Sequence, residues 1–210
     1  MVGAGTTTTA WAFTIAIYYL LSNPAILRNL KSELAPLPDS MPLTTLEALP
    51  YLTGVIQESL RLSYGVSHRL QRIAPNETLT FTDRSTGKTW LIPRGTPVGM
   101  TSTHIHHDES IFQDSCNFRP ERWIENPRLD KYLITFSKGS RRCVGMELAY
   151  AELRLLLAAI FKRFGGGEVK GEEGTLQLFE TEKRDVLIAE DHFVPRPWKG
   201  SKGVRILVTD

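Results

Sequence analysis

One cysteine stands between two glycines in the segment FSKGSRRCVG at residues 136–145. The chain of 210 residues contains only two cysteines, Cys116 and Cys143, so a disulfide framework is not expected. A helical pattern begins just after Cys143, and the N-terminus of a helix favours the thiolate form of a cysteine. The thiolate is the form that binds metals. The segment is therefore either an iron–thiolate site or a glycine-rich turn with a buried structural cysteine.

The other positions of this segment fit an iron site built around a flat cofactor. Gly139 and Gly145 allow tight turns and a close approach of the backbone to such a cofactor. Phe136 can shield the sulfur from water, and Arg141 can pair with a carboxylate at the cofactor edge. The complete pattern Phe-x-x-Gly-x-Arg-x-Cys-x-Gly therefore favours a ligand role for Cys143.

The segment resembles the heme-binding loop of the cytochrome P450 family, and every fixed position of that signature is present. The resemblance implies heme b as the cofactor, with Cys143 as the axial ligand of its iron. It also places Phe136, Gly139, Arg141 and Gly145 around the cofactor. In this family the thiolate donates electron density to the iron and promotes cleavage of the O–O bond.

Two further motifs precede the cysteine segment in the order that this family shows. Glu58 and Arg61 in QESLRL resemble its Glu-x-x-Arg motif, and Arg122 in PERW resembles the arginine that joins this pair. An exposed pair contributes only about 0.3 kcal/mol, whereas the resemblance implies a buried cluster that fixes the cysteine loop.

Arg72 aligns with an arginine of the family that contacts a heme propionate. Arg69 is an alternative partner, and a solvated strand charge is the simpler interpretation.

The N-terminal segment GAGTTTT resembles the part of the family's long helix that crosses the distal face of the heme. Ala4 and Gly5 match its small residues, and Thr8 matches the threonine that helps to deliver protons to bound oxygen. Thr7 stands where the family usually has an acidic residue. Because a hydroxyl is a poor proton source, this departure indicates a water-based relay or chemistry without oxygen activation. Without the resemblance, residues 6–9 would simply fill a helix interior.

Hydrophobic periodicity predicts helices over residues 10–22, about 50–62 and 147–164, and a further helix that starts at Pro24 with Asn23 as its N-cap. Short runs separated by turn residues predict β-strands in the middle of the chain. The predicted fold class is mainly α-helical with small β-sheets. The resemblance implies the C-terminal part of the cytochrome P450 fold, with the N-terminal half missing.

The chain is expected to form one domain with successive parts. Hydrophobic residues make up 41% and charged residues 23%, as in globular proteins, and the net charge of +2 does not indicate a nucleic-acid-binding protein. The parts are helical (1–64), β-rich (65–105), a short helix and meander (106–135), the heme-binding loop and its helix (136–164), and C-terminal strands and loops (165–210).

The histidines of THIHHDES, residues 103–110, offer an alternative metal site. His104, His106 and Asp108 have the spacing that opens a binuclear zinc site of the metallo-β-lactamase type, which would make the protein a metallohydrolase. Such a site needs another histidine after the aspartate, but Glu109 stands there. The alternative is therefore not favoured. In the P450 interpretation a strand leads into a short helix, with the HHD stretch, residues 106–108, at its start.

The resemblance implies a heme-thiolate monooxygenase that inserts one oxygen atom from O2 into a small organic substrate. An NADPH-dependent reductase would supply the electrons, and no nucleic acid is expected as a partner. The segments YGVSHRLQRIAP and SKGSRRCVGMELAYAEL are similar to fungal microsomal members of the trichodiene-oxygenase and benzoate-hydroxylase type. This similarity indicates a secondary metabolite, such as a terpenoid, as substrate.

Full-length members of that type lie at the endoplasmic reticulum membrane through an N-terminal helix. The first apolar helix of this chain has the pattern of a core helix whose beginning is missing. The alternative to an active enzyme is therefore a truncated, non-catalytic remnant of a heme-thiolate monooxygenase.

Overall fold

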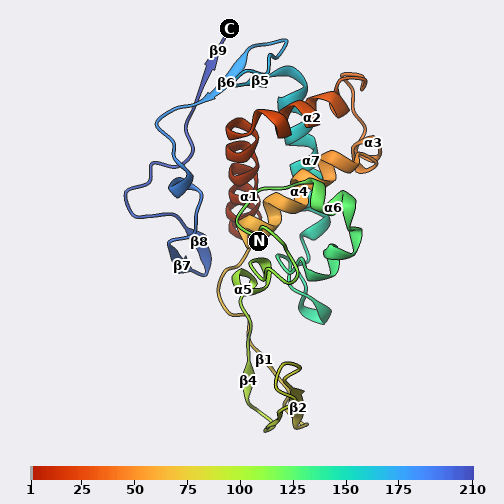
Figure 1. Cartoon of the computed structure of the whole chain (residues 1–210), viewed down its shortest axis with the longest axis vertical. Coiled ribbons are helices and arrows are strands. Elements are labelled where there is room, and N and C mark those ends of the chain that lie inside the picture. Colours follow the sequence, from red (N-terminus) through yellow and green to blue (C-terminus); the bar gives the residue numbers. More distant parts are fainter. Residues whose placement is uncertain (1) are drawn as a thin grey trace.

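The computed structural model describes residues 2–210 and shows a helical body with a narrow β-sheet arm at one end (Figure 1). The predicted class, mainly α-helical with small β-sheets, is confirmed. The helices are α1 (Val2–Ser22), α2 (Pro24–Leu34), α3 (Leu43–Glu47), α4 (Pro50–Ser63), α5 (Ser102–His106), α6 (Glu121–Glu125) and α7 (Met146–Arg163), with 3-10 turns η1 (Pro127–Tyr132), η2 (Gly139–Arg141) and η3 (Lys183–Asp185).

The strands form small, separate sheets. In the arm, two antiparallel pairs place Arg72 opposite Val98 and Phe81 opposite Trp90. The C-terminal strands follow one side of the helical body (Figure 1), where β6 pairs with β5 and β9, and β7 forms a hairpin with β8. The strands are β1 (Arg72–Ile73), β2 (Leu79–Thr82), β3 (Thr89–Ile92), β4 (Pro97–Val98), β5 (Gly165–Gly166), β6 (Thr175–Leu178), β7 (Glu190–His192), β8 (Val194–Arg196) and β9 (Ile206–Thr209).

The core lies where α1, α4 and α7 meet. Residues 15–21 of α1 are all buried, and their apolar side chains join Leu52 and Ile56 of α4 and Leu153 and Leu157 of α7 in one cluster. Each such side chain contributes about 1.5–3 kcal/mol when it is buried, so packing holds α1 in place. Among the described residues, no single helix has the length and hydropathy of a membrane span, although α1 and α2 do together, across a bend of 106°.

Helix α2 satisfies free backbone groups at the ends of two neighbouring helices. The carboxylate of Glu33 accepts the backbone N–H groups of Tyr51 and Leu52, each at 2.8 Å, in the first turn of α4. The ammonium group of Lys31 donates to the carbonyl oxygens of Phe161 at 2.8 Å and Phe164 at 2.9 Å, at the end of α7. Each charge also complements the helix dipole. Helix α2 therefore fixes α4 and α7 relative to each other.

Replacing Lys31 with methionine is expected to lower the free energy of unfolding by about 1–3 kcal/mol, because carbonyl groups at the end of α7 lose a charged donor. The measurement is urea denaturation followed by circular dichroism. Arg28→Met, at an exposed position of the same helix, is the matched control and should change stability by less than about 0.5 kcal/mol. Equal losses in the two variants would contradict the capping role of Lys31.

Two details of the helices differ from the sequence predictions. Asn23 lies at the N-cap position of α2 but does not cap this helix, and its Nδ2 donates instead to the Tyr19 carbonyl in the last turn of α1 at 2.7 Å. Helix α5 begins at Ser102, before the predicted boundary at residue 106, and His106 is its last residue rather than its start. Ser102 Oγ donates to the Tyr64 carbonyl at 3.1 Å. This hydrogen bond joins residues that lie far apart in the chain, so the local sequence could not predict that the helix begins at Ser102.

Candidate functional site

A pocket of about 180 Å³ brings together segments that lie far apart in the sequence. Thr8 and Thr9 of α1 line it, together with Phe136, Arg141 and Cys143 of the cysteine segment. A free thiol therefore borders the same space as hydroxyl groups from a long helix. The other lining residues are mainly small or apolar: Leu60, Ser63, Gly65, Val66, Leu70, Thr135, Ser137, Ala149 and Leu153.

A second hollow, of about 360 Å³, adjoins this pocket, and the two share lining residues, Ser137 among them. His68, Arg72 and Lys138 also line this hollow, which we therefore call the cationic hollow. Arg72 is held there by its Nη2, which donates to Ser137 Oγ at 3.0 Å. Arg69, the predicted alternative to Arg72, is exposed and does not belong to the lining.

The donor groups of the two cavities fit heme. The mainly apolar lining of the pocket suits the faces of a macrocycle, a cysteine thiolate is a ligand for iron, and the cations of the hollow suit the carboxylates of propionate groups. Arg141 and Arg72 were predicted as partners of those carboxylates, and they line the pocket and the hollow respectively. His68 was not predicted as a site residue, because a lone histidine outside any motif carries no signal.

The cysteine segment is closed by one backbone hydrogen bond, from the Cys143 N–H to the Phe136 carbonyl at 2.8 Å. The Phe136 ring lies 5.5 Å from the ring of Tyr150 in α7. Gly139 has a φ of +75°, a left-handed conformation that glycine adopts without strain. Gly145 has a φ of −89°, and a Cβ atom there would make only an ordinary contact, 3.9 Å from the sulfur. The backbone thus favours glycine at residue 139 but not at residue 145.

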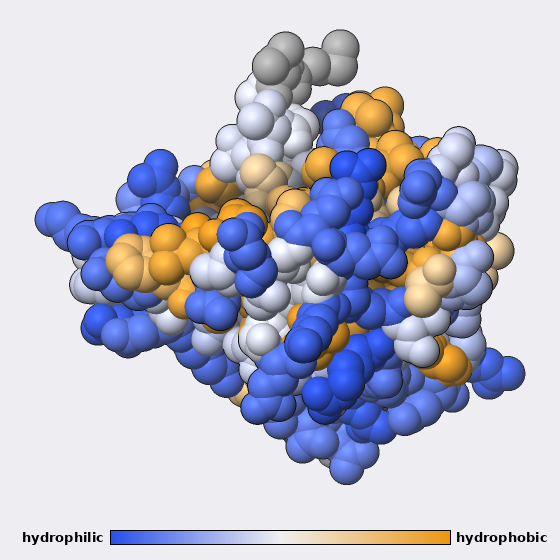
Figure 2. Space-filling model, turned by 90° about the horizontal axis from the view of Figure 1, so that it is seen from above, coloured by the Kyte–Doolittle hydropathy of each residue, from blue (hydrophilic) through white to orange (hydrophobic). Residues whose placement is uncertain are grey.

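The predicted distal residues fall into two groups. Thr8 lines the pocket, and its Oγ1 donates to the Ala4 carbonyl at 2.8 Å. Ala4, Gly5 and Thr7 are exposed in the first turns of α1, which project from the body (Figure 2), and they do not line the pocket. Thr9 lines the pocket although it was not predicted as a site residue. Its only signal in the sequence was its place in the run of threonines.

Glu58, Arg61 and Arg122 form a buried ion cluster, in which the exposed fractions are 0%, 0% and 4%. Arg61 makes a bidentate pair, with Nε donating to Glu58 Oε2 at 2.9 Å and Nη2 donating to Oε1 at 2.8 Å. Arg122 Nε donates to Oε1 at 3.1 Å, and Trp123 Nε1 donates to Oε2 at 2.9 Å. Such a cluster contributes little net stability, but losing one member leaves an uncompensated buried charge.

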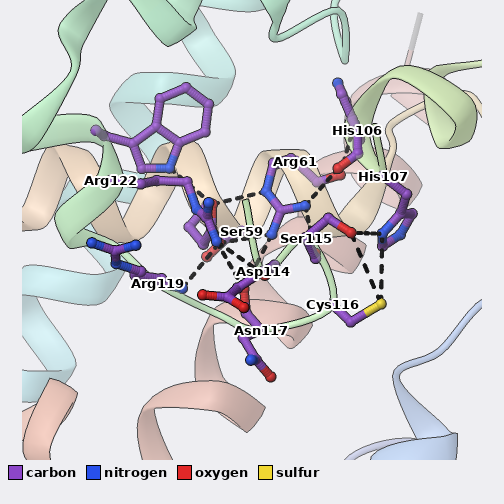
Figure 3. A network of polar contacts seen from close by, with 12 residues as sticks. Ser59, Arg61, His106, His107, Asp114, Ser115, Cys116, Asn117, Arg119 and Arg122 are labelled. Carbon is purple, nitrogen blue, oxygen red and sulfur yellow. Dashed lines mark hydrogen bonds and ion pairs between the residues drawn. The ribbon is translucent and has the colours of Figure 1, made fainter. Parts of the chain in front are cut away.

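The other ends of both guanidinium groups bind one irregular segment, residues 113–117 (Figure 3). Arg61 Nη1 donates to the Ser115 carbonyl at 2.8 Å, and Arg122 Nη1 donates to the Gln113 carbonyl at 2.6 Å. Because this segment has no helix or strand of its own, its backbone groups need other partners. The ion cluster binds its carbonyl groups, and the Glu109 carboxylate accepts the N–H groups of Asp114 and Ser115.

His106 connects the end of α4 to the cysteine segment. Its Nε2 accepts the backbone N–H of Ile134 at 3.1 Å, so the proton is on Nδ1, which donates to the Arg61 carbonyl at 2.8 Å. Next along the chain, Thr135 Oγ1 donates to the Leu60 carbonyl at 2.8 Å. The helix that carries the ion cluster therefore holds, at two points, the chain that enters the cysteine loop.

The alternative zinc site does not form. His106 is buried with both ring nitrogens in use, whereas His104 is exposed. Asp108 Oδ1 accepts hydrogen bonds from the hydroxyl and backbone N–H of Ser110 in a local turn. Within residues 2–210, no group of three or more His, Cys, Asp or Glu side chains is placed to hold a metal ion. A metallohydrolase is therefore not supported.

Glu58→Gln is expected to lower the free energy of unfolding by about 3–5 kcal/mol, because Arg61 and Arg122 would be left as buried charges without their counter-ion. Chemical denaturation measures the change. The matched control is Glu125→Gln, which breaks an ion pair with Arg119 whose carboxylate is 56% exposed, and it should cost no more than about 1 kcal/mol. The structural role of the cluster is wrong if the two variants are equally stable.

His106 also makes stability depend on pH. Burial lowers the pKa of this side chain from 6.5 to about 3, so the folded chain keeps the ring neutral while the unfolded chain can protonate it. The contribution is therefore fully present above pH 6.5 and is lost as the pH falls toward 3, with a slope of at most about 1.4 kcal/mol per pH unit.

Denaturation at pH 6.5 and pH 5 tests this contribution in a window where most carboxylates remain ionised. His106→Gln should weaken the pH dependence relative to the unmodified chain, whereas His104→Gln, at an exposed position, should leave it unchanged. The same pH dependence in all three proteins would show that His106 is not the responsible group.

Comparison with known proteins agrees with this geometry. A profile of the cytochrome P450 family matches residues 1–191. The cytochrome P450 monooxygenase astB of Talaromyces wortmannii is 53% identical over an alignment of 221 residues, gaps included. The alignment covers 100% of this chain and 44% of that protein. The monooxygenase tpcC of Cochliobolus heterostrophus is 54% identical over 215 residues, 100% of this chain and 41% of that protein.

A third relative, the cytochrome P450 monooxygenase MO6277 of Ascocoryne sarcoides, is 46% identical over 216 residues, 99% of this chain and 39% of that protein. The chain thus spans less than half the length of these fungal relatives. The matches confirm the predicted resemblance, and with it the fold class, which is that of the C-terminal part of the cytochrome P450 fold.

Proposed function

Because the chain belongs to the cytochrome P450 family, we propose that it forms the heme-binding part of a heme-thiolate monooxygenase. The reaction inserts one oxygen atom from O2 into an organic substrate, and an NADPH-dependent reductase supplies the electrons. One observation carries the proposal: the thiol of Cys143, an apolar pocket and the cationic hollow adjoin one another.

The residues that would hold heme b have separate tasks. Cys143 lies just before the N-terminus of α7 and would bind the iron through its sulfur. Phe136 lines the same pocket and, with heme bound, would limit the access of water to the sulfur. Arg141 and Arg72 would pair with the carboxylates of the propionates. Bound heme supplies the iron chemistry that activates O2.

Helix α1 contributes to the supply of protons, because Thr8 and Thr9 bring hydroxyl groups to the pocket. The proton of Thr8 Oγ1 is engaged by the Ala4 carbonyl, so the free lone pairs of this oxygen can accept a hydrogen bond from water. Thr7 is exposed and has no carboxyl group. We therefore propose that protons reach the pocket through water that Thr8 holds, with solvent rather than a side chain as the source.

The substrate proposed is an apolar secondary metabolite such as a terpenoid. Its support is the similarity of residues 64–75 and 137–153 to fungal members of the family. The same similarity supports a location at the endoplasmic reticulum membrane for the whole protein.

The test is heme reconstitution of the chain, followed by the spectrum of the ferrous–CO complex. Cys143→Ser should abolish the red-shifted Soret band that reports thiolate ligation, because a hydroxyl does not replace a thiolate on iron. Cys116→Ser removes the other cysteine of the chain and should leave the band unchanged.

An unchanged band in Cys143→Ser would overturn the assignment of the axial ligand. If the unmodified chain takes up no heme at all, the alternative of a non-catalytic remnant replaces the proposed function for this chain.

A further inference from the structure

Asp191 joins the C-terminal hairpin of β7 and β8 to the connection between α4 and β1. Its Oδ1 accepts a hydrogen bond from Ser67 Oγ at 2.8 Å, and its Oδ2 lies 3.0 Å from His68 Nδ1. The backbone adds a further link, since the Ser67 N–H donates to the Phe193 carbonyl at 3.1 Å. In Figure 1 the hairpin lies at the level of α5, on the side where the chain leaves α4. These contacts connect residues more than 120 positions apart.

The carboxylate of Asp191 determines how the His68 ring is held. Burial raises the pKa of Asp191, but hydrogen bonds from Ser67, His68 and the Phe193 N–H outweigh burial and hold this pKa below its ordinary value. The side chain is therefore a carboxylate at neutral pH and accepts the proton on His68 Nδ1. A histidine whose Nδ1 donates to a carboxylate has a fixed ring orientation, and its protonated form has an Nε2–H left to donate. Its Nε2 remains for another partner.

The backbone that carries His68 is held from a second direction. Thr101 Oγ1 donates to the Ser67 carbonyl at 2.7 Å, and Ser102 Oγ donates to the Tyr64 carbonyl at 3.1 Å. Ser67 itself is buried, with 3% of its surface exposed. The histidine is therefore presented by a restrained segment, which lowers the entropy lost when a ligand binds.

We propose that Asp191 positions His68 as a third cationic contact, beside Arg72 and Lys138, for a carboxylate group in the cationic hollow. The ligand is a carboxylate because the hollow combines a guanidinium, an ammonium and a histidine ring with the Ser137 hydroxyl, next to an apolar pocket that takes the rest of the molecule. The inference rests on the proposed function, since a heme propionate is the nearest source of such a group. A substrate carboxylate is the second source.

Heme titration of the heme-free chain tests the contact. His68→Gln and Asp191→Asn should each weaken heme binding by about threefold to tenfold, the effect of one charge-assisted hydrogen bond at a partly exposed site. His192→Gln is the matched control, because His192 is 55% exposed and pairs with Glu190, as His68 is 58% exposed and pairs with Asp191. His192 does not line the hollow. His68→Gln keeps the contact between Ser67 and Asp191, so it tests the proposal even if Asp191→Asn disturbs the hairpin.

Two further arms identify the source of the carboxylate. With the dimethyl ester of heme, the unmodified chain and His68→Gln should bind equally if His68 contacts a propionate. An equal loss with both forms of heme would overturn the proposal, because no carboxylate would be involved. In the second arm, NMR signals of the His68 ring are followed while sodium propionate is added to the heme-free chain. A saturable shift of His68 but not of His192 is expected.

The outcomes separate this inference from the proposed function. If the unmodified chain binds no heme but the His68 signal shifts with propionate, the carboxylate site stands and the heme proposal fails. If heme binds equally to the unmodified chain and His68→Gln while the shift persists, the site belongs to a substrate carboxylate. If neither heme affinity nor the NMR signal involves His68, the proposal is wrong and the heme proposal is unaffected.

Discussion

The carboxylate of Glu58, buried between two guanidinium groups, is the interaction on which the rest of the structure depends. A fully buried carboxylate destabilises the fold unless hydrogen-bond donors surround it. Here Arg61, Arg122 and Trp123 all donate to the buried carboxylate of Glu58. The two arginines in turn need acceptors at their other ends. They find them in backbone carbonyls of residues 113–117, which therefore fold around the cluster.

The same helix transmits this order to the cysteine. The last turn of α4 presents carbonyl groups that bind His106 and Thr135, and His106 binds the backbone of Ile134. At Gly65, just after α4, a Cβ atom would lie 2.6 Å from the Thr135 carbonyl, so the chain entering the cysteine loop packs directly against this turn. The ion cluster thus adds little net stability, but the helix that carries it holds the chain that enters the cysteine segment.

The candidate site consists of parts that no single element could supply. Helix α1 contributes hydroxyl groups, the connection after α4 contributes apolar residues and His68, and the cysteine segment contributes the thiol and Arg141. The C-terminal hairpin adds Asp191, which contacts Ser67 and His68. Apolar and cationic surfaces therefore meet along one continuous pair of cavities, and that juxtaposition is what a flat cofactor with acidic edges needs.

The sequence by itself determined the family and the class of fold, and it predicted the ligand role of Cys143, because the motif around Cys143, the pair of Glu58 with Arg61, and PERW have fixed local spacings. The positions of the long helices also followed from periodicity, because the apolar residues of a buried helix face recur every three or four positions in the sequence. Only the tertiary structure decided that Thr8 and Thr9, but not Thr7, line the pocket, and that residues 102–106 form a helix. The roles of His68 and Asp191, and of the caps from α2, depend on contacts across tens of residues or more. Such contacts arise from packing, which leaves no pattern in the chain.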